Sequence, residues 1–580
     1  MSVADSLQRG VWHVSRECDG IAEAGGLKDV VAGLSAALAA EGIRTAVVLP
    51  RYGSIDLEGL KAGHTGIHFD LQMPLDAGGE QSDTGGTADG AAARRGRAGR
   101  DAGGEQEKRH GQGGRSAIGI ERVEVYHCRR QGVDVYLLDS PCTRSKRAIY
   151  TYTAEEERED ARKRKGTGHW DAHYLNLLLQ RGALELARVV GAPDVFHCHD
   201  GHSAFLPAIL RVCSPYREGF EGSRALVTIH NAGRGYHQEI YDPDLAAALT
   251  GLPEEVLSAG MAGGAVDPFL VGAAYAPINT VSEGYAQEIN SGQLEQLTGG
   301  LGAAFKARGV RMLGITNGIA PRAFDPRYPE HSGLPFAFDP ARGELAGKRR
   351  CRERFIGLLA GREQERSGGT PAAPELAGLE IFGSLGSALE QPLYTFVGRL
   401  TGQKGVDILA GAVDRYLASG ADVQFLILGQ GEKAIEEHLL EIARRPQGRG
   451  KLCLLIGYNG QAAKYVYGCG DFFLVPSQYE PCGLTDLFAQ MMGNLPIVHA
   501  VGGLIKVLPG VTGYSYREHS VEALVTAIAE TISDYTDNPE RLERLRRQAF
   551  TEVFEHYTWE KVLREGYLPL YQAETQARHG

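Results

Sequence analysis

The sequence has no long uninterrupted run of apolar residues. No window approaches the roughly 20 apolar residues that a helix needs to cross a bilayer, which argues against a membrane partner. The first residues, MSVADSLQRGVWHVSRE, also lack the basic region and apolar stretch of a secretion signal. Both absences lead us to expect a cytoplasmic protein.

A surplus of positive charge is also missing. The 580 residues include 61 Lys and Arg against 72 Asp and Glu, which gives a formal net charge of -11. Because nucleic-acid backbones are bound by an excess of Lys and Arg, we expect no nucleic-acid partner. The nine cysteines include no C-x-x-C pair, which favours a reducing compartment over a disulfide framework.

Large apolar side chains are absent from one internal stretch. Between Asp76 and Ala117 the chain has no Val, Ile, Leu, Met, Phe, Tyr or Trp. Such a segment cannot bury enough apolar surface to offset its ordering entropy, so we expect a solvated, disordered insertion at 76–117. Its basic core, RRGRAGR, is also compatible with a nucleic-acid patch, but the acidic residues around it weaken that interpretation. A second polar stretch, at about 361–380, is expected to be another loop.

Most of the remaining chain alternates short apolar runs with longer segments of helical periodicity. This alternation is typical of parallel sheets covered by helices on both faces. In the first half we expect strands at 11–15, 45–50, 134–138, 194–198, 225–230 and 277–282. In the second half we expect them at 393–398, 423–429, 451–457, 471–476 and 496–500. The pattern predicts an α/β protein with two doubly wound domains, one at 1–325 and one at 326–560.

The first expected strand leads into a glycine pair and then into a segment of helical periodicity. Gly25 and Gly26 precede a helix whose apolar face begins at Leu27. The free N–H groups and positive dipole end at such a place favour an anion, and glycine allows a phosphate to approach the backbone closely. The pair is therefore compatible with phosphate binding and equally with an ordinary strand-to-helix turn.

Three histidines and an aspartate lie at or just beyond the carboxyl end of the strand expected at 194–198. In the segment DVFHCHDGHSAF, Asp200 lies at the sheet edge where open parallel sheets place their ligands. The spacing of His197, His199 and His202 permits a metal site. No additional carboxylate–histidine motif accompanies it, so a polar sugar or acceptor site is favoured.

A histidine and an asparagine, His230 and Asn231, end the next strand in the segment ALVTIHNAGRGY. A lone histidine is usually a structural hydrogen-bonding residue. Its position at a strand end, beside the previous cluster in a parallel sheet, favours a functional role.

In the second half, the segment FVGRLTGQKG places two cations just beyond a buried strand. Arg399 and Lys404 are suited to clamp a diphosphate and to stabilise the charge that grows on it as it leaves, although solvated surface cations are the alternative. Glu480 stands before a helix-like run, where a carboxylate can bind sugar hydroxyls or stabilise a cationic anomeric carbon. Cys482 is interpreted as a packed residue rather than a nucleophile, because no activating partner is evident.

These segments, in this order, resemble the bacterial glycogen synthase and plant starch synthase family. The resemblance covers nearly the whole chain apart from the insertions and rests on four motifs: H-x-H-D (197–200), T-x-H-N (228–231), G-R-L-T-x-Q-K-G (398–405) and E-P-C-G-L-T (480–485). It implies the GT-B fold, with two Rossmann-like domains facing a central cleft and a C-terminal helix at 561–580 that crosses back to the N-terminal domain. It also implies a retaining glucosyltransferase that transfers glucose from ADP-glucose to the non-reducing end of an α-1,4-glucan such as glycogen, with no metal or other cofactor.

The resemblance implies roles for individual residues. It places His230, Arg399, Lys404 and Glu480 in the active site, the two cations at the diphosphate and the carboxylate at the donor sugar. The positions that match the acceptor side of the family's cleft are Asp200, His202 and Asn231. The positions that match the donor side are Gly25, Gly26, Asp29, Asn317, Gly457, Tyr458, Cys482, Gly483, Leu484 and Thr485.

Three positions depart from the family's motifs. The lysine of K-x-G-G-L is Glu23 here, the tryptophan of H-D-W-H is Gly201, and the aspartate of G-G-L-x-D is Lys506. An anionic Glu23 near a diphosphate is repulsive unless it is paired or protonated, and the missing tryptophan removes a stacking surface. The choice between ADP-glucose and UDP-glucose therefore stays open, as do another retaining GT-B enzyme and a catalytically weak glucan-binding protein. The retained diphosphate cations and carboxylate favour catalysis.

Overall fold

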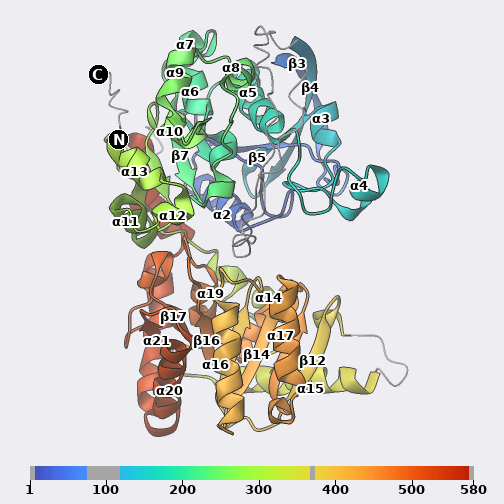
Figure 1. Ribbon diagram of the computed structural model, residues 1–580, viewed down its shortest axis with the longest axis vertical. Coiled ribbons are helices and arrows are strands. Elements are labelled where there is room, and N and C mark those ends of the chain that lie inside the picture. The colour runs from blue at the N-terminus through green and yellow to red at the C-terminus, as the bar shows by residue number, and fades with distance from the viewer. Residues whose placement is uncertain (1–6, 75–117, 366–372, 574–580) are drawn as a thin grey trace, which may run out of the picture. The chain divides into compact units, whose positions relative to one another are not determined.

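The computed structural model describes residues 7–74, 118–365 and 373–573 (Figure 1). The chain forms two compact units: the first comprises residues 1–280, 288–313 and 563–580, and the second comprises residues 281–287 and 314–562. The insertion expected at 76–117 lies outside the described residues. Within those residues, no helix is long and apolar enough to cross a membrane.

The first unit is built on a nine-stranded sheet in its described part. Its strands are β1 (Val11–Val14), β2 (Thr45–Pro50), β3 (Gly63–Pro74), β4 (Ile118–Arg130), β5 (Val133–Asp139), β6 (Val195–His199), β7 (Arg224–Ile229), β10 (Ile278–Thr280) and β11 (Leu313–Gly314). Their order is β11-β10-β7-β6-β1-β2-β5-β4-β3. Pairing is parallel from β10 to β5, whereas β4 is antiparallel to both of its neighbours. A separate two-stranded ribbon consists of β8 (Met261–Ala262) and β9 (Ala265–Val266).

Helices follow most strands of the first unit. α2 (Leu27–Ala40) begins after the glycine pair, as predicted, and buries Leu27, Val31 and Leu34. α5 (Ala172–Val190) buries a long apolar face and contacts β2 and β3. The others are α3 (Pro141–Arg144), α4 (Ala154–Glu159), α6 (Leu206–Val212), α7 (Tyr216–Gly219), α8 (Pro243–Thr250), α9 (Glu254–Ala259), α10 (Pro268–Ala273), α12 (Glu295–Thr298), α13 (Leu301–Ala307) and α23 (Leu568–Gln572). One more helix, α11 (Glu283–Ser291), is divided between the two units, because residues 281–287 belong to the second.

The second unit is built on a seven-stranded sheet in its described part. Its strands are β12 (Glu380–Leu385), β13 (Leu393–Val397), β14 (Gln424–Gly429), β15 (Lys451–Ile456), β16 (Phe472–Val475), β17 (Leu495–His499) and β18 (Tyr514–Tyr516). Their order is β12-β15-β14-β13-β16-β17-β18, and only β12 pairs in the antiparallel sense. The helices are α14 (Pro329–Ser332), α15 (Ala346–Glu365), α16 (Val406–Ala418), α17 (Lys433–Arg444), α18 (Gly460–Cys469), α19 (Thr485–Met491), α20 (Val521–Asp537), α21 (Pro539–His556) and α22 (Trp559–Val562).

Each central strand of the second sheet divides its apolar residues between two cores. On β14, Phe425 and Ile427 pack into the core that contains α16 and α20, whereas Leu426 and Leu428 pack into the core that contains α15 and α18. Successive side chains of a strand point to opposite faces, so a strand covered on both sides needs a continuous apolar run. In Figure 1, α16 and α17 run side by side in front of this sheet.

The predicted α/β architecture with two Rossmann-like units is confirmed, but the sheets are mixed rather than wholly parallel. Sequence analysis missed β3 because most of its side chains are exposed, so it lacks a continuous apolar run. The insertion predicted at about 361–380 overlaps the end of α15, which continues to Glu365, and β12 begins at Glu380, where the insertion was predicted to end. Residues 366–372 lie outside the described residues.

Candidate active site

Four histidines line the carboxyl ends of the central strands in the first unit. His13 lies on β1, His197 and His199 lie on β6, and His230 follows β7 directly. The register pairs His13 with His197, which brings the two strands' histidines together. His13 Nδ1 lies 3.0 Å from His199 Nε2, and His199 Nδ1 lies 3.0 Å from His230 Nε2. The predicted active-site histidine is therefore joined to the sheet interior by a chain of imidazole hydrogen bonds.

Burial keeps these imidazole rings neutral. It lowers the pKa of His13 to about 3 and the pKa of His230 to about 3. A neutral imidazole carries one N–H and one lone pair, so each ring within the chain donates on one side and accepts on the other. The tautomers of His13, His199 and His230 are therefore coupled, and sequence analysis did not identify His13 as part of this site.

The fourth histidine, His197, uses both ring nitrogens within the protein. Its Nε2 lies 2.6 Å from the hydroxyl of Thr228, which donates in turn to Asn279 Oδ1 at 2.6 Å. His197 Nε2 must therefore donate, which leaves Nδ1 to accept from the hydroxyl of Tyr571 at 2.8 Å. A residue of the last helix thus fixes the orientation of a strand histidine.

The histidines that come together differ from the three considered as metal ligands in the sequence. Potential ligand atoms of His13, His197 and His199 lie within 4.8 Å of one another. His202 belongs elsewhere, because its Nε2 accepts from the backbone N–H of Arg16 at 3.3 Å. An ion at the three histidines would have to displace the hydrogen bonds of His197. The expectation of a metal-free enzyme remains a prediction.

A buried aspartate anchors the turn that carries two of the predicted residues. Asp200 has a backbone φ of 56°, in the left-handed region that few non-glycine residues adopt. Its Oδ1 accepts from the backbone N–H of His230 at 2.6 Å and from that of Asn231 at 3.4 Å. Burial raises the pKa of Asp200 to about 7, although these two N–H groups act in the opposite direction. The structure therefore brings these three predicted residues together.

The N–H group of Gly25, the first glycine of the pair, is hydrogen-bonded to the side-chain carboxylate of Glu17. Glu17 Oε2 accepts from the N–H of Gly25 at 2.6 Å and from that of Ala24 at 3.0 Å, and Tyr150 donates to Glu17 Oε1 at 2.7 Å. The N–H group that sequence analysis considered for a phosphate is thus already bonded within the protein. Glu17 was missed, although its position as a carboxylate shortly before a glycine pair is a usable signal.

The acidic residues that flank the glycine pair have different surroundings. Glu23 accepts from the N–H of Gly20 at 2.7 Å and lines a cavity of about 310 Å³. Lys28 lies 2.8 Å from Asp29 and 2.8 Å from Asp19. The nearest lysine in sequence is therefore engaged by two other carboxylates, and Glu23 is exposed.

In the second unit, two of the predicted catalytic residues are in contact. Lys404 precedes α16 and Glu480 follows β16, and their Nζ and Oε2 atoms lie 2.5 Å apart. Ser477 donates to the same carboxylate oxygen at 3.1 Å. Burial alone would raise the pKa of Glu480, but Lys404 and Ser477 lower it below its ordinary value. Glu480 is therefore ionised, as a group that stabilises positive charge must be.

The other predicted residues of the second unit lie mainly on loops at one edge of its sheet. Because β13, β15 and β16 are parallel, the loops 399–404, 457–458 and 480–485 share the carboxyl edge. Arg399 donates to Gln403 at 2.8 Å rather than to the carboxylate, and Tyr458 is 77 % exposed. The edge thus carries two cations, an anion and an exposed aromatic ring.

Two further residues that were predicted on the donor side lie together in this unit. The backbone of Asn317 hydrogen-bonds to the sulfur of Cys482, and burial raises the pKa of that thiol to about 11. Cys482 is therefore protonated and packed, in agreement with its interpretation from the sequence.

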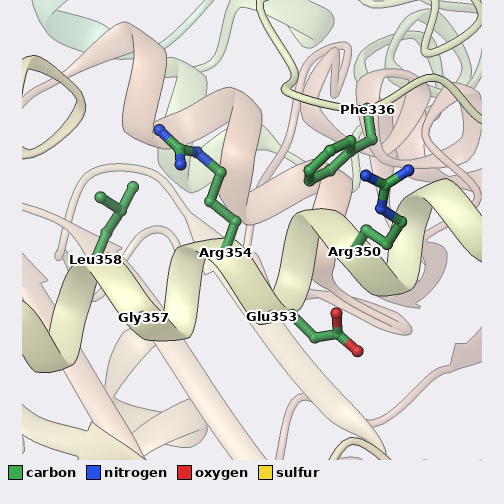
Figure 2. Close-up of a pocket in the computed structure, with 6 residues that line it drawn as sticks. All are labelled: Phe336, Arg350, Glu353, Arg354, Gly357 and Leu358. Atoms are coloured by element: carbon green, nitrogen blue, oxygen red, sulfur yellow. The ribbon is translucent and has the colours of Figure 1, made fainter.

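A cavity of about 400 Å³ lies along α15, apart from these residues (Figure 2). Its lining consists of Phe336, Arg350, Glu353, Arg354, Gly357 and Leu358. The guanidinium of Arg350 stacks on the ring of Phe336, 3.8 Å from its centre. None of the predicted site residues lines this cavity, so it is not part of the candidate active site.

The chain is similar to known families and proteins over most of its length. A family model described as the starch synthase catalytic domain matches residues 10–88 and 100–305, and one described as glycosyl transferases group 1 matches residues 391–534. Glycogen synthase 1 of Geobacter sulfurreducens is 29 % identical over 558 residues, covering 94 % of this chain and 92 % of that protein. The glycogen synthase of Thermodesulfovibrio yellowstonii is 30 % identical over 393 residues, covering 66 % of this chain and 70 % of that protein.

Solved structures show the same fold. The catalytic domain of starch synthase IV from Arabidopsis thaliana, bound to ADP and acarbose, has a TM-score of 0.71 at 22 % identity and covers 97 % of this chain and 98 % of its own. Sucrose-phosphate synthase from Thermosynechococcus elongatus has a TM-score of 0.50 at 15 % identity, with 96 % and 98 % covered. The fold is GT-B, and the chain belongs to the family of bacterial glycogen synthases and plant starch synthases.

Proposed function

We propose that this chain transfers glucose from ADP-glucose to the non-reducing end of an α-1,4-glucan, with retention of configuration and without a metal ion. The observation that carries the proposal is the contact between Lys404 and Glu480 at the carboxyl edge of the second sheet. Family membership supports the reaction class. The Arabidopsis protein of similar fold, which was solved with ADP and acarbose, supports the choice of donor and acceptor.

The two cations act on the leaving group. When the bond between glucose and the diphosphate breaks, negative charge grows on the diphosphate. Arg399 and Lys404 lie on one loop at the sheet edge, where positive charge stabilises the transition state more than the bound substrate. These side chains supply the charge that a metal ion provides in other transferases.

The carboxylate acts on the glucosyl group. Glu480 is ionised and held by Lys404 and Ser477, so it can stabilise the positive charge that develops at the anomeric carbon. It acts electrostatically in this proposal and not as a covalent nucleophile. In the first unit, His230 is neutral and is suited to hydrogen-bond a sugar hydroxyl.

Glu23 favours one second candidate, which is transfer from a different nucleotide sugar. The carboxylate replaces the lysine that the family places near the donor, and no lysine close to it in sequence neutralises it. The first experiment therefore has to compare donors.

The purified chain should be incubated with glycogen and either ADP-glucose or UDP-glucose, and glucan-bound glucose should be measured. We expect transfer from ADP-glucose. Glu480→Gln keeps the shape but removes the charge, so we expect turnover to fall by about 10²–10³-fold with little change in nucleotide affinity. Glu437→Gln is the matched control, because Glu437 forms an exposed ion pair with Lys433 at 3.6 Å.

Each outcome separates the candidates. Transfer from UDP-glucose alone would replace the donor assignment but keep the reaction class. Binding of glucan without transfer from either donor would identify a glucan-binding protein. Normal turnover in Glu480→Gln would remove that residue from the mechanism.

A further inference from the structure

A buried lysine packs beneath the loop that follows Glu480. Lys506 ends a short turn after β17, and its side chain is only 5 % exposed. The side chain of Asp486, at 0 % exposure, lies 3.0 Å from the Lys506 ammonium. A buried charge is costly unless it is paired and fully hydrogen-bonded, so this lysine needs a structural reason.

The ammonium is bonded mainly to backbone oxygens. Lys506 Nζ donates to the carbonyl oxygens of Cys482 at 2.7 Å, Gly483 at 2.6 Å and Gly503 at 3.0 Å. A side chain that gathers carbonyls from two loops fixes how those peptide planes are turned. The aspartate that the family's motif has at this position would repel the same oxygens.

A contact that fixes the direction of a carbonyl group also fixes the direction of the N–H group in the same peptide plane. In a planar trans peptide the carbonyl oxygen and the amide hydrogen point in opposite directions. The carbonyl of Cys482 shares its plane with the N–H of Gly483, and the carbonyl of Gly483 shares its plane with the N–H of Leu484. Lys506 therefore turns two consecutive N–H groups away from itself, and neither has an acceptor in the part of the chain that is described.

Two glycines make this close approach possible. Gly483 has a φ of 71°, and a Cβ atom there would lie 2.9 Å from Asp486 Oδ1 and 3.1 Å from Lys506 Nζ. A Cβ atom on Gly503 would lie 2.1 Å from the carbonyl oxygen of Cys482. Successive N–H groups in a turn with a left-handed residue form a concave site that attracts anions.

We propose that Lys506 is a positioning residue for the diphosphate of the nucleotide substrate. By holding the carbonyls of Cys482 and Gly483, it directs the N–H groups of Gly483 and Leu484 toward the phosphate oxygens. The inference rests on the proposed function, since it requires a diphosphate at this loop. It assigns a role to a residue that departs from the family's motif.

The test compares nucleotides with and without phosphates. Lys506→Met is combined with Asp486→Asn, so that no buried carboxylate is left unpaired. Dissociation constants are measured by calorimetry for ADP and adenosine, and for UDP and uridine. Because a hydrogen bond to a charged group is lost, we expect the diphosphate to bind about tenfold more weakly while the nucleoside binds unchanged.

A matched control exists in the same unit. Lys348 is also buried, and its ammonium donates to the carbonyls of Gly468 at 3.0 Å and Met492 at 2.8 Å, away from the loop that follows Glu480. Lys348→Met removes a similar set of bonds, so it should lower stability without changing the ratio of diphosphate to nucleoside affinity.

The outcomes separate the two proposals. If the wild type binds ADP or UDP and the double variant binds it equally well, the positioning role is overturned. Equal weakening of diphosphate and nucleoside also overturns it, because that result means a general loss of the loop. Failure of the wild type to bind either diphosphate overturns the proposed function itself.

A second measurement covers the case in which the double variant does not fold. In the wild-type protein, ADP should slow hydrogen exchange at the amides of Gly483 and Leu484, whereas adenosine should leave both rates unchanged. Exchange that responds equally to ADP and adenosine, or to neither, overturns the inference.

Discussion

The backbone of a neighbouring segment occupies the space where residue 201 would carry a side chain. A Cβ atom on Gly201 would lie 2.1 Å from the carbonyl oxygen of His237 and 2.8 Å from that of Tyr236. The tryptophan of the family's motif therefore has no room here. The carbonyl groups of Tyr236 and His237 fill the space beside residue 201.

Substitution of Gly201 should destabilise the first unit. We expect Gly201→Ala to lower the free energy of unfolding by about 1–3 kcal/mol, because the methyl group overlaps backbone atoms, and Gly201→Trp to lower it further. Calorimetric melting provides the measurement. Gly219→Ala is the control, since an added methyl there meets no atom within 4 Å. Equal melting temperatures for the two alanine variants would contradict this explanation.

At the scale of an element, a buried ion pair holds the segment between β7 and α8. His237 Nδ1 lies 2.8 Å from Asp267 Oδ2, and its Nε2 lies 2.9 Å from the carbonyl oxygen of Ala232. Both ring nitrogens donate, so the imidazolium form is the one that fits. Burial alone would lower the pKa of His237, but Asp267 and the Ala232 carbonyl raise it above its ordinary value.

This pair should make stability depend on pH. Because the pKa of His237 is higher in the folded state than in the unfolded state, its contribution is fully present below about pH 6.5 and is lost as pH rises through the folded pKa. The stability difference between the wild type and His237→Asn should therefore shrink from pH 6 to pH 9. Chemical denaturation at several pH values measures it. His68→Asn, at an exposed position, should show no such trend, and a flat profile for His237→Asn would exclude the ion pair as its cause.

At the scale of the whole molecule, the end of the chain belongs to the first unit although the preceding helices belong to the second. Tyr571 donates to His197 at 2.8 Å, Arg224 donates to the carbonyl of Gln572 at 3.1 Å, and Arg564 pairs with Glu41 at 2.8 Å. The last helix therefore completes the surroundings of the strand histidines.

Removal of this contact should weaken the first unit. Tyr571→Phe leaves His197 Nδ1 buried without a donor, so we expect a loss of about 1–3 kcal/mol, and truncation after Val562 should cost more. Tyr241→Phe is the control, because Tyr241 is 67 % exposed. Thermal unfolding and hydrogen exchange at β6 measure the effect. Unchanged exchange at β6 in the truncated chain would show that the last helix does not support it.

The sequence by itself determined the elements whose signal is local. The run at 423–429 became β14 because a strand covered on both faces needs apolar residues at every position. Lys404 and Glu480 were each predicted as site residues from their positions beyond a strand end, but their contact follows from the strand order, which places β13 beside β16. The exposed strand β3 was missed because half-exposed strands carry no such run.

Only the tertiary structure decided which partners the polar groups of the site have. His13 meets His199 across 186 positions of sequence, and Glu17 takes the N–H of Gly25 that a phosphate would need. The sequence shows only that Lys506 replaces the aspartate of the family's motif. The structure shows that its ammonium binds three backbone carbonyl groups. Hydrogen bonds and buried charges depend on the distances and directions of a few atoms, which the packing of the whole unit sets and no local pattern records.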